Sequence, residues 1–201
     1  MDWSVVHDLN ELIRTHDLLE DPLTLFASLA VTVYAVATVA LWFVSRPEGA
    51  RRLRLACISA LTAAGLGLLV NQAIGHLWDR PRPYLAHPHA LVLFTAPSHD
   101  PSFPSDHATA SFAIAVAVWF FSRRLGAVFL VFAAAIALSR VLLGMHYPTD
   151  VLAGALTGTL AAVAVCTLGS RIVYRLTDLA ARVTDPVLQP RWRLAGRGAQ
   201  G

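Results

Sequence analysis

Apolar residues in this chain of 201 residues are grouped into long runs separated by short polar connections. A helix needs roughly 20 apolar residues to cross the hydrocarbon core of a membrane, and five runs approach that length. They cover residues 23–44, 53–77, 103–121, 125–143 and 151–173. The pattern predicts an all-α, polytopic membrane helical bundle with about five transmembrane helices. The runs leave no room for a separate soluble module, so residues 1–201 are expected to form one domain.

The first 22 residues follow a different pattern. Val5, Val6, Leu9, Leu12 and Ile13 recur at helical spacing, and acidic residues occupy the other faces. This arrangement predicts an amphipathic helix over residues 1–22 that lies in the membrane interface and does not cross the bilayer.

Composition supports the membrane class. Hydrophobic residues make up 56% of the chain, against the 45–50% that is usual in soluble domains even with glycine counted. The formal net charge of +3 could suggest a nucleic-acid partner. However, the basic residues lie between apolar runs and not along one face, so no nucleic-acid partner is expected. All 16 basic residues are arginines, because the chain contains no lysine.

The positions of the arginines predict the orientation of the bundle. Basic connections remain on the cytoplasmic side of a membrane. This rule places the connections after the first and third runs and the tail, residues 176–201, in the cytoplasm. The N-terminal segment and the connections 78–102 and 144–149 then lie outside. We expect a multi-pass protein of the cell (plasma) membrane with a cytoplasmic C-terminus. The arginines concerned are Arg46, Arg51, Arg52, Arg54, Arg123, Arg124, Arg171, Arg175, Arg182, Arg191, Arg193 and Arg197.

The two outer connections and the adjoining helix ends contain nearly all the residues capable of chemistry. In the long connection, Arg80 and Arg82 alternate with Pro81 and Pro83, which prevent helix formation and stiffen the stretch. These arginines could be anchors at the membrane interface. They could equally bind phosphate, whose oxygens match the arginine fork.

The third run opens with Ser105, Asp106 and His107. The first turn of a helix has unpaired amides and the positive end of the helix dipole, so it can bind an anion. Ser105 or Asp106 could instead be a simple N-cap. An imidazole at position 107 could donate a proton to a leaving oxygen.

The fourth run ends near Arg140, which either binds an anionic partner or extends outward to the membrane surface. His146 and Asp150 follow, four residues apart. The aspartate could accept a proton from one ring nitrogen and leave the other nitrogen free to attack, as in a catalytic triad without its serine. No third metal ligand is evident nearby, so neither a metal site nor another cofactor is expected.

Three groups of residues resemble the signature motifs of the type 2 phosphatidic acid phosphatase (PAP2) superfamily. Within it, residues 80–84 and 102–109 are most similar to bacterial undecaprenyl-diphosphatases of the bacitracin-resistance type, and the resemblance covers about residues 53–173. Gly75 stands where the family usually has a lysine, and His76 or Arg80 could supply that charge. The three groups are Arg82-Pro83, Pro104-Ser105-Asp106-His107, and Ser139-Arg140 followed by His146 and Asp150.

The resemblance implies a catalytic core over residues 53–173 and a role for each motif residue. His146 would attack phosphorus, Asp150 would orient it, and His107 would protonate the departing oxygen. Water would then hydrolyse the resulting phosphohistidine, without a metal ion. The residues expected to hold the phosphate are Arg82, Ser105, Arg140 and the amides around Asp106, with Arg80 and His76 as further candidates.

The implied substrate is polyprenyl (undecaprenyl) diphosphate, converted to the monophosphate. Phosphatidic acid, phosphatidylglycerol phosphate and a glycosylated prenyl phosphate remain alternatives. The expected partners are therefore this lipid-linked substrate and membrane lipids, and the sequence does not fix the oligomeric state. A site at the outer boundary of the membrane also favours lipid substrates on geometry alone.

Two other classes of function were weighed. An anion transporter would place polar residues along the depth of several helices, but the deep parts of these runs are almost wholly alanine, leucine, valine and phenylalanine. An inactive scaffold is supported only by the missing lysine. The presence of His107, His146 and Asp150 argues against it.

Overall fold

A computed structural model describes residues 2–44, 51–94, 96–98 and 100–197, and within them the secondary structure is entirely helical. This confirms the predicted all-α class. Residues 45–50 of the connection after the first run, with Arg46, and the last four residues of the tail lie outside the described residues. The helices are α1 (Asp2–Arg14), α2 (Asp17–Val44), α3 (Arg51–Leu77), α4 (Pro83–Ala86), α5 (Asp106–Phe121), α6 (Arg123–Leu142), α7 (Pro148–Thr167) and α8 (Ser170–Arg197).

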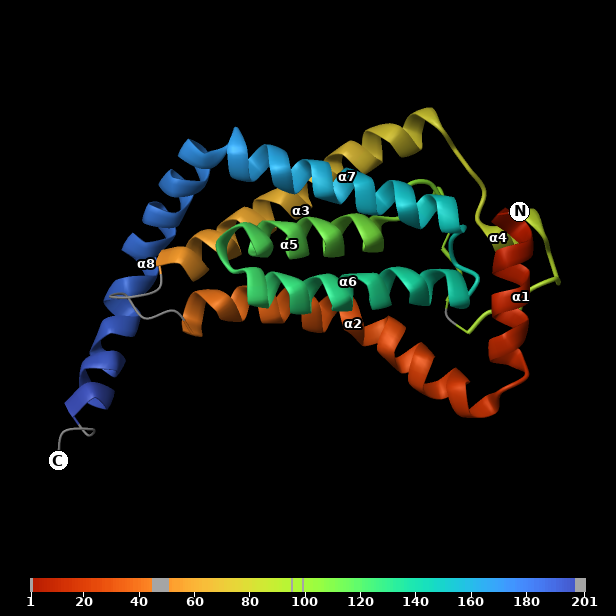
Figure 1. Cartoon of the computed structure of the whole chain (residues 1–201), viewed down its shortest axis with the longest axis horizontal. Coiled ribbons are helices and arrows are strands. Elements are labelled where there is room, and N and C mark those ends of the chain that lie inside the picture. Colours follow the sequence, from red (N-terminus) through yellow and green to blue (C-terminus); the bar gives the residue numbers. More distant parts are fainter. Residues whose placement is uncertain (1, 45–50, 95, 99, 198–201) are drawn as a thin grey trace.

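Four of these helices, α2, α3, α6 and α7, are long and apolar enough to cross a membrane. The third predicted span, α5, is apolar but has only 16 residues, a length of about 24 Å. It begins three residues later than expected, because Pro104 disfavours helical backbone at Phe103 and Ser105, whose backbone is extended, is the N-cap. Helix α5 packs against α3, α6 and α7, so the shortest span lies at the centre of the bundle (Figure 1).

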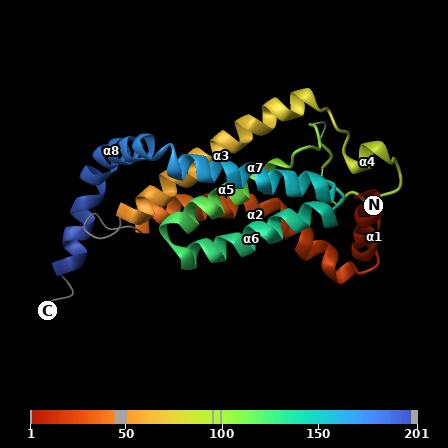
Figure 2. The ribbon, with the colours of Figure 1, turned by 45° about the horizontal axis from the view of Figure 1, so that its top comes forward.

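The N-terminal segment differs from the prediction of one interfacial helix over residues 1–22. Helix α1 ends at Arg14, because the hydroxyl of Thr15 lies 3.0 and 3.1 Å from the carbonyl oxygens of Glu11 and Leu12 and closes the last turn. The chain turns there, and α2 begins at Asp17. Figures 1 and 2 show α1 lying across the end of the bundle that carries α4.

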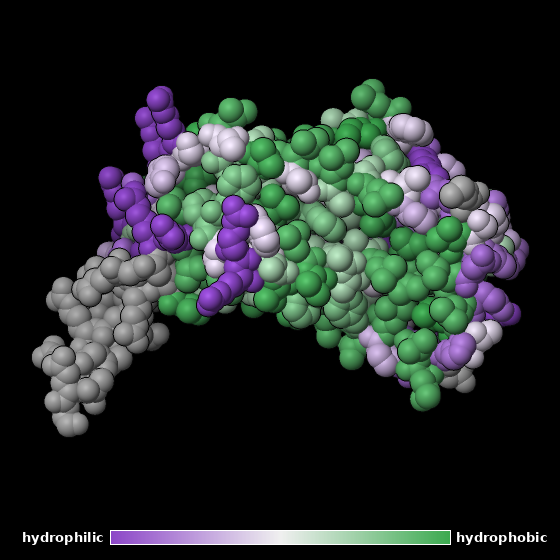
Figure 3. Space-filling view, viewed as in Figure 1, coloured by the Kyte–Doolittle hydropathy of each residue, from purple (hydrophilic) through white to green (hydrophobic). Residues whose placement is uncertain are grey.

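The C-terminal boundary also differs. The fifth predicted span was expected to reach residue 173, but α7 ends at Thr167 and α8 leaves the bundle at a steep angle (Figure 2). Arg54 of α3 forms an ion pair of 2.7 Å with Asp185 of α8. The predicted tail is therefore largely a helix that packs against the bundle. Figure 3 shows hydrophilic side chains at both ends of the molecule and an apolar band between them.

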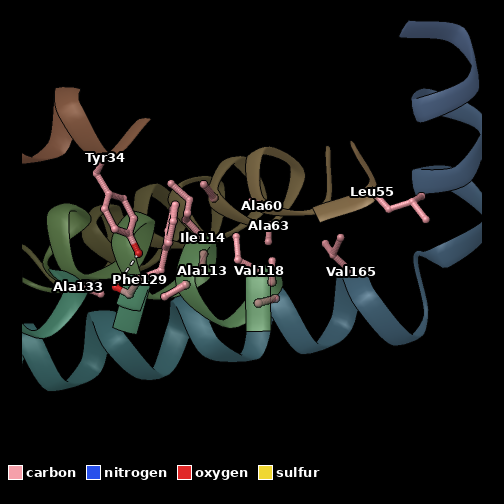
Figure 4. Packing of buried hydrophobic residues seen from close by; sticks show 14 of the residues in the cluster. Tyr34, Leu55, Ala60, Ala63, Ala113, Ile114, Val118, Phe129, Ala133 and Val165 are labelled. Carbon is pink, nitrogen blue, oxygen red and sulfur yellow. Dashed lines mark hydrogen bonds between the residues drawn. The ribbon is translucent and has the colours of Figure 1, made fainter. Parts of the chain in front are cut away.

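Small side chains fill the core. Ala60, Ala63, Ala113 and Ala133 are fully buried, and Figure 4 shows them within one cluster contributed by neighbouring helices. Small residues let membrane helices approach closely, which increases their van der Waals contact. Close packing of α5 between α3 and α7 fixes the depth at which the first turn of α5 lies.

The glycines of α7 provide a test of this packing. A Cβ atom at Gly158 would overlap the carbonyl oxygen of Thr109 in α5, whereas one at Gly65 of α3 would meet nothing within 4 Å. We expect Gly158→Ala to destabilise the protein by about 1–3 kcal/mol and Gly65→Ala to leave the melting temperature unchanged or higher. Thermal unfolding of both variants in detergent measures this, and equal melting temperatures would contradict the close approach of α5 and α7.

Candidate active site

His146 lies in the turn between α6 and α7, with its side chain almost fully buried. Its Nδ1 atom is 2.8 Å from the carbonyl oxygen of Ser102. A carbonyl oxygen only accepts hydrogen bonds, so Nδ1 must carry the proton and Nε2 must carry the free lone pair. Nε2 lies 3.5 Å from Nη1 of Arg82. The ring nitrogen that can act as a nucleophile therefore lies beside a guanidinium group.

Asp150 was predicted to accept a proton from His146 directly, but the structure shows a less direct arrangement. Its Oδ2 atom is 3.8 Å from Nδ1, beyond hydrogen-bond distance. The fully buried carboxylate instead accepts hydrogen bonds from the Ser102 hydroxyl at 2.5 Å and from the backbone amide of Tyr147 at 2.9 Å. Asp150 is thus linked to the imidazole through Ser102, whose carbonyl oxygen lies beside Nδ1 of the ring.

Ser102 is a site residue that the sequence analysis did not single out. Its contribution to His146 comes from the main chain, and the identity of a side chain carries no signal for such a contact. The sequence offered only its position, immediately before the stretch from Phe103 to His107.

Arg82 and Arg140 are the two arginines beside His146. Arg82 donates from Nε to the carbonyl oxygen of Asp100 at 2.9 Å, and Arg140 donates from Nη2 to the carbonyl oxygen of Ala27 at 2.6 Å. Both side chains are buried, and in the described part of the chain neither forms an ion pair with a carboxylate. Nε of Arg140 also has no hydrogen-bond partner among the described residues. Buried charges are costly unless they are paired, so these two guanidinium groups favour an anion between them.

A cavity of about 400 Å³ brings together five of the predicted residues, from the loop before α4, the first turn of α5, the last turn of α6 and the turn after it. Its walls include Arg82, Asp106, His107, Arg140 and His146. The first turn of α5 and the last turn of α6 therefore place an imidazole and a guanidinium group around the same space as His146. This arrangement suits binding of an anion and proton transfer to it.

Ser105 lies behind this cavity. It is the N-cap of α5, with Oγ 3.5 Å from the amide nitrogen of Ala108, and its own amide donates to the carbonyl oxygen of Asp150 at 3.0 Å. Its side chain is fully buried and does not line the cavity. The structure therefore favours the N-cap alternative for Ser105.

His76 lines a second cavity, of about 170 Å³, together with Asn71 and Gly75. The two cavities adjoin, since Asp100, Pro101, Pro104 and Asp106 line both. The Asp106 carboxylate accepts a hydrogen bond of 2.8 Å from Asn71. The structure thus places His76 next to the site but does not bring it to the cavity of His146.

Arg80, the other candidate phosphate ligand, is occupied elsewhere. Nη1 donates to Asp150 at 2.6 Å and to Thr149 at 2.7 Å, and Nη2 donates to Asp2 at 2.7 Å. Its guanidinium carbon lies 3.9 Å from the centroid of the Tyr147 ring. Arg80 lines neither of the two cavities, so the geometry places it behind Asp150 as a support.

The environment of His146 favours its neutral form. Burial lowers the pKa of His146 below its ordinary value; the Asp150 carboxylate opposes this shift and the charge of Arg82 adds to it. A neutral imidazole has a free lone pair, which a nucleophile requires.

The PAP2 superfamily model matches residues 55–174. The undecaprenyl-diphosphatase BcrC of Bacillus subtilis (strain 168) is 28% identical over 190 residues, which are 94% of this chain and 91% of that protein. The putative undecaprenyl-diphosphatase YbjG of Escherichia coli (strain K12) is 36% identical over 129 residues, 64% of this chain and 62% of that one.

Two solved structures share the fold. Aquifex aeolicus LpxE superposes with a TM-score of 0.63 and 26% identity, over 78% of this chain and 91% of its own. A PAP2-type phosphatidylglycerolphosphate phosphatase from Bacillus subtilis gives a TM-score of 0.59 and 20% identity, over 84% of this chain and 86% of its own. The second likeness concerns the fold alone.

The unpaired arginines predict binding of a tetrahedral oxyanion. We expect inorganic phosphate to raise the melting temperature of the purified protein, because a ligand that binds the folded state stabilises it. Arg140→Gln should weaken the phosphate affinity at least about tenfold, since it removes charged hydrogen bonds. Arg124→Gln, which changes the same charge at the other end of α6, should leave the affinity unchanged. Equal shifts in all three proteins would contradict an anion site at Arg140.

Proposed function

We propose that this chain, which belongs to the PAP2 superfamily and is a multi-pass membrane phosphatase, hydrolyses undecaprenyl diphosphate to undecaprenyl monophosphate. One observation carries the reaction: His146, with Nε2 beside Arg82, lines a cavity together with two buried arginines that have no carboxylate partner among the described residues. The substrate is supported by the names of BcrC and YbjG, the relatives that resemble this chain.

In the first step of the proposed reaction, Nε2 of His146 attacks the terminal phosphorus atom. The bond from phosphorus to the bridging oxygen breaks, and His107 donates a proton to that oxygen as undecaprenyl monophosphate leaves. Arg82, Arg140 and the free amides of the first turn of α5 neutralise the phosphoryl oxygens. Phosphoryl transfer depends mainly on such positioning and charge neutralisation.

The second step hydrolyses the phosphohistidine. His107, now neutral, accepts a proton from water, and the oxygen of that water attacks phosphorus. The bond between phosphorus and Nε2 breaks, inorganic phosphate leaves, and His146 recovers its lone pair. Throughout both steps Nδ1 keeps its proton, because that proton is bonded to the carbonyl oxygen of Ser102.

The position of the site supports a lipid substrate. The residues around the cavity come from the ends of α5, α6 and the turn before α7, at the same end of the bundle as α1 and α4 (Figure 1). A phosphate group at this depth can bind there while its hydrocarbon chain remains in the bilayer. We further propose that this end faces the extracytoplasmic side and that α8 is cytoplasmic, as the arginine distribution predicts.

Phosphate release tests the reaction. Detergent-purified protein should release phosphate from undecaprenyl diphosphate in the presence of a chelator. His146→Ala should reduce the rate by roughly a thousandfold or more, and His107→Ala by about 10²–10⁴-fold. His89→Ala, an exposed histidine of the outer loop, serves as the control. Phosphatidic acid, phosphatidylglycerol phosphate and a glycosylated prenyl phosphate are the comparison substrates.

The outcomes of this assay separate mechanism from substrate. Activity that survives in His146→Ala would overturn the phosphohistidine mechanism. Faster release from one of the comparison lipids would overturn the assignment of undecaprenyl diphosphate and leave the mechanism in place.

Cysteine labelling tests the orientation. Ala90 is exposed in the long connection between α3 and α5. In a background with Cys57 and Cys166 replaced by alanine, we expect Ala90→Cys to react with a membrane-impermeant reagent added to intact cells. Labelling only after lysis would place the site on the cytoplasmic side.

A further inference from the structure

The first helix reaches the catalytic centre through Asp2. Its carboxylate accepts hydrogen bonds from Nη2 of Arg80 at 2.7 Å and from the hydroxyl of Thr149 at 2.5 Å. The other arm of Arg80 donates to Oδ1 of Asp150 at 2.6 Å. A carboxylate near the N-terminus, outside the residues that match the family, is thus joined through one arginine to the carboxylate that positions Ser102 and His146.

Other contacts hold α1 in the place from which Asp2 reaches Arg80. The Trp3 ring stacks on His87 with 3.7 Å between centroids. Asn10 donates to the carbonyl oxygen of Val92 at 3.1 Å and accepts from its amide at 2.9 Å. Val6 is fully buried. Because these contacts carry no formal charge, the attachment of α1 and the charge of Asp2 can be varied separately.

Asp2, Arg80 and Asp150 form a row of three charged groups with alternating signs. Arg80 alone would cancel the charge of the buried Asp150. Asp2 shares Arg80 and leaves the row with one net negative charge. Asp2 is ionised at neutral pH: burial alone would raise its pKa, but the hydrogen bonds from Thr149 and Arg80 outweigh this effect and bring the pKa below its usual value.

This net charge matters when His146 forms its bond to phosphorus. Nε2 then gives up its lone pair while Nδ1 keeps its proton, so the ring becomes cationic. The cavity faces the ring with Arg82, Arg140 and His107, none of which favours a further positive charge. The net negative charge of the row formed by Asp2, Arg80 and Asp150 stabilises the cationic ring of His146 and the transition state that leads to it.

We propose that Asp2 is a positioning residue of the reaction: by sharing Arg80 with Asp150, it keeps the Asp150 carboxylate aimed at Ser102 and keeps negative charge behind His146. The proposal rests on the phosphohistidine reaction proposed above. It assigns the N-terminal helix a role in catalysis in addition to any role in binding the membrane surface.

Asp2→Asn removes the charge and nearly preserves the shape of the side chain. We expect kcat for undecaprenyl diphosphate to fall about tenfold, as for the loss of one charge at roughly 10 Å and an effective dielectric constant near 20, with KM changed less than about twofold. Asp2→Glu, which restores the charge, should recover part of the loss. Asp8→Asn, the same charge change at an exposed position of the same helix, should leave kcat unchanged.

Two further variants separate positioning from attachment of the helix. Asn10→Ala weakens the attachment of α1 without changing charge. If Asp2 acts through Arg80, then adding Asp2→Asn to an Arg80→Gln variant should lower kcat no further, since the group that transmits the effect is gone. Melting temperatures of all variants show which of them remain folded.

Each result decides the proposal. A tenfold loss in kcat confined to Asp2→Asn, absent in the Arg80→Gln background, supports it. If Asp2→Asn matches Asp8→Asn, or if Asn10→Ala reproduces the loss with the same change in melting temperature, Asp2 is only a structural contact and the proposal is overturned. Wild-type protein that releases no phosphate from any of the lipids would overturn the proposed function and this inference together, and so is distinguishable from the other failures.

Discussion

The buried carboxylate of Asp150 is the constraint on which the site depends. A carboxylate with no solvent exposure is costly unless hydrogen-bond donors and an opposite charge compensate it. The donors come from segments far apart in the sequence: the Ser102 hydroxyl from the loop before α5, the Tyr147 amide from the turn before α7, and Arg80 from the loop after α3. Satisfying one charge therefore fixes three loops relative to one another. His146 lies among them, with its ring held by the carbonyl oxygen of Ser102.

The packing of the bundle determines where α5 lies relative to Asp150. Helix α5 carries His107 and the free amides, and its depth is set by small residues that allow α7 to lie against it. Gly154 faces the carbonyl oxygen of Ser105, and Gly158 faces that of Thr109 one turn deeper. Any side chain at these glycines would push α5 away from Asp150 and break the hydrogen bond from the Ser105 amide to the Asp150 carbonyl oxygen. The spacing of small residues therefore also determines the position of His107.

Hydropathy and motif spacing were sufficient to predict the helical class, the number of apolar spans and five of the residues that line the main cavity. They failed where the deciding contact lies outside the pattern. The end of α1 depends on the Thr15 hydroxyl, and the orientation of His146 depends on a main-chain oxygen. The contact between Asp2 and Thr149 joins residues 147 positions apart. Arg80 and Arg82 illustrate the limit best, since two arginines in one extended stretch have the same local sequence signal but different partners.

The contrast between these arginines also helps to explain how the site could do without the lysine that the family usually has at the position of Gly75. Arg80 is bound to two carboxylates, so its charge is already neutralised, whereas Arg82 and Arg140 have no carboxylate partner among the described residues. A lysine at position 75 would lie in the second cavity, next to the carboxylate of Asp106, which in this chain is held by Asn71. Much of its charge would be neutralised by Asp106 before it reached a phosphate in the main cavity. The proposed attraction for phosphate therefore rests on Arg82 and Arg140, and on this proposal the loss of a third cation costs less here than the motif alone would suggest.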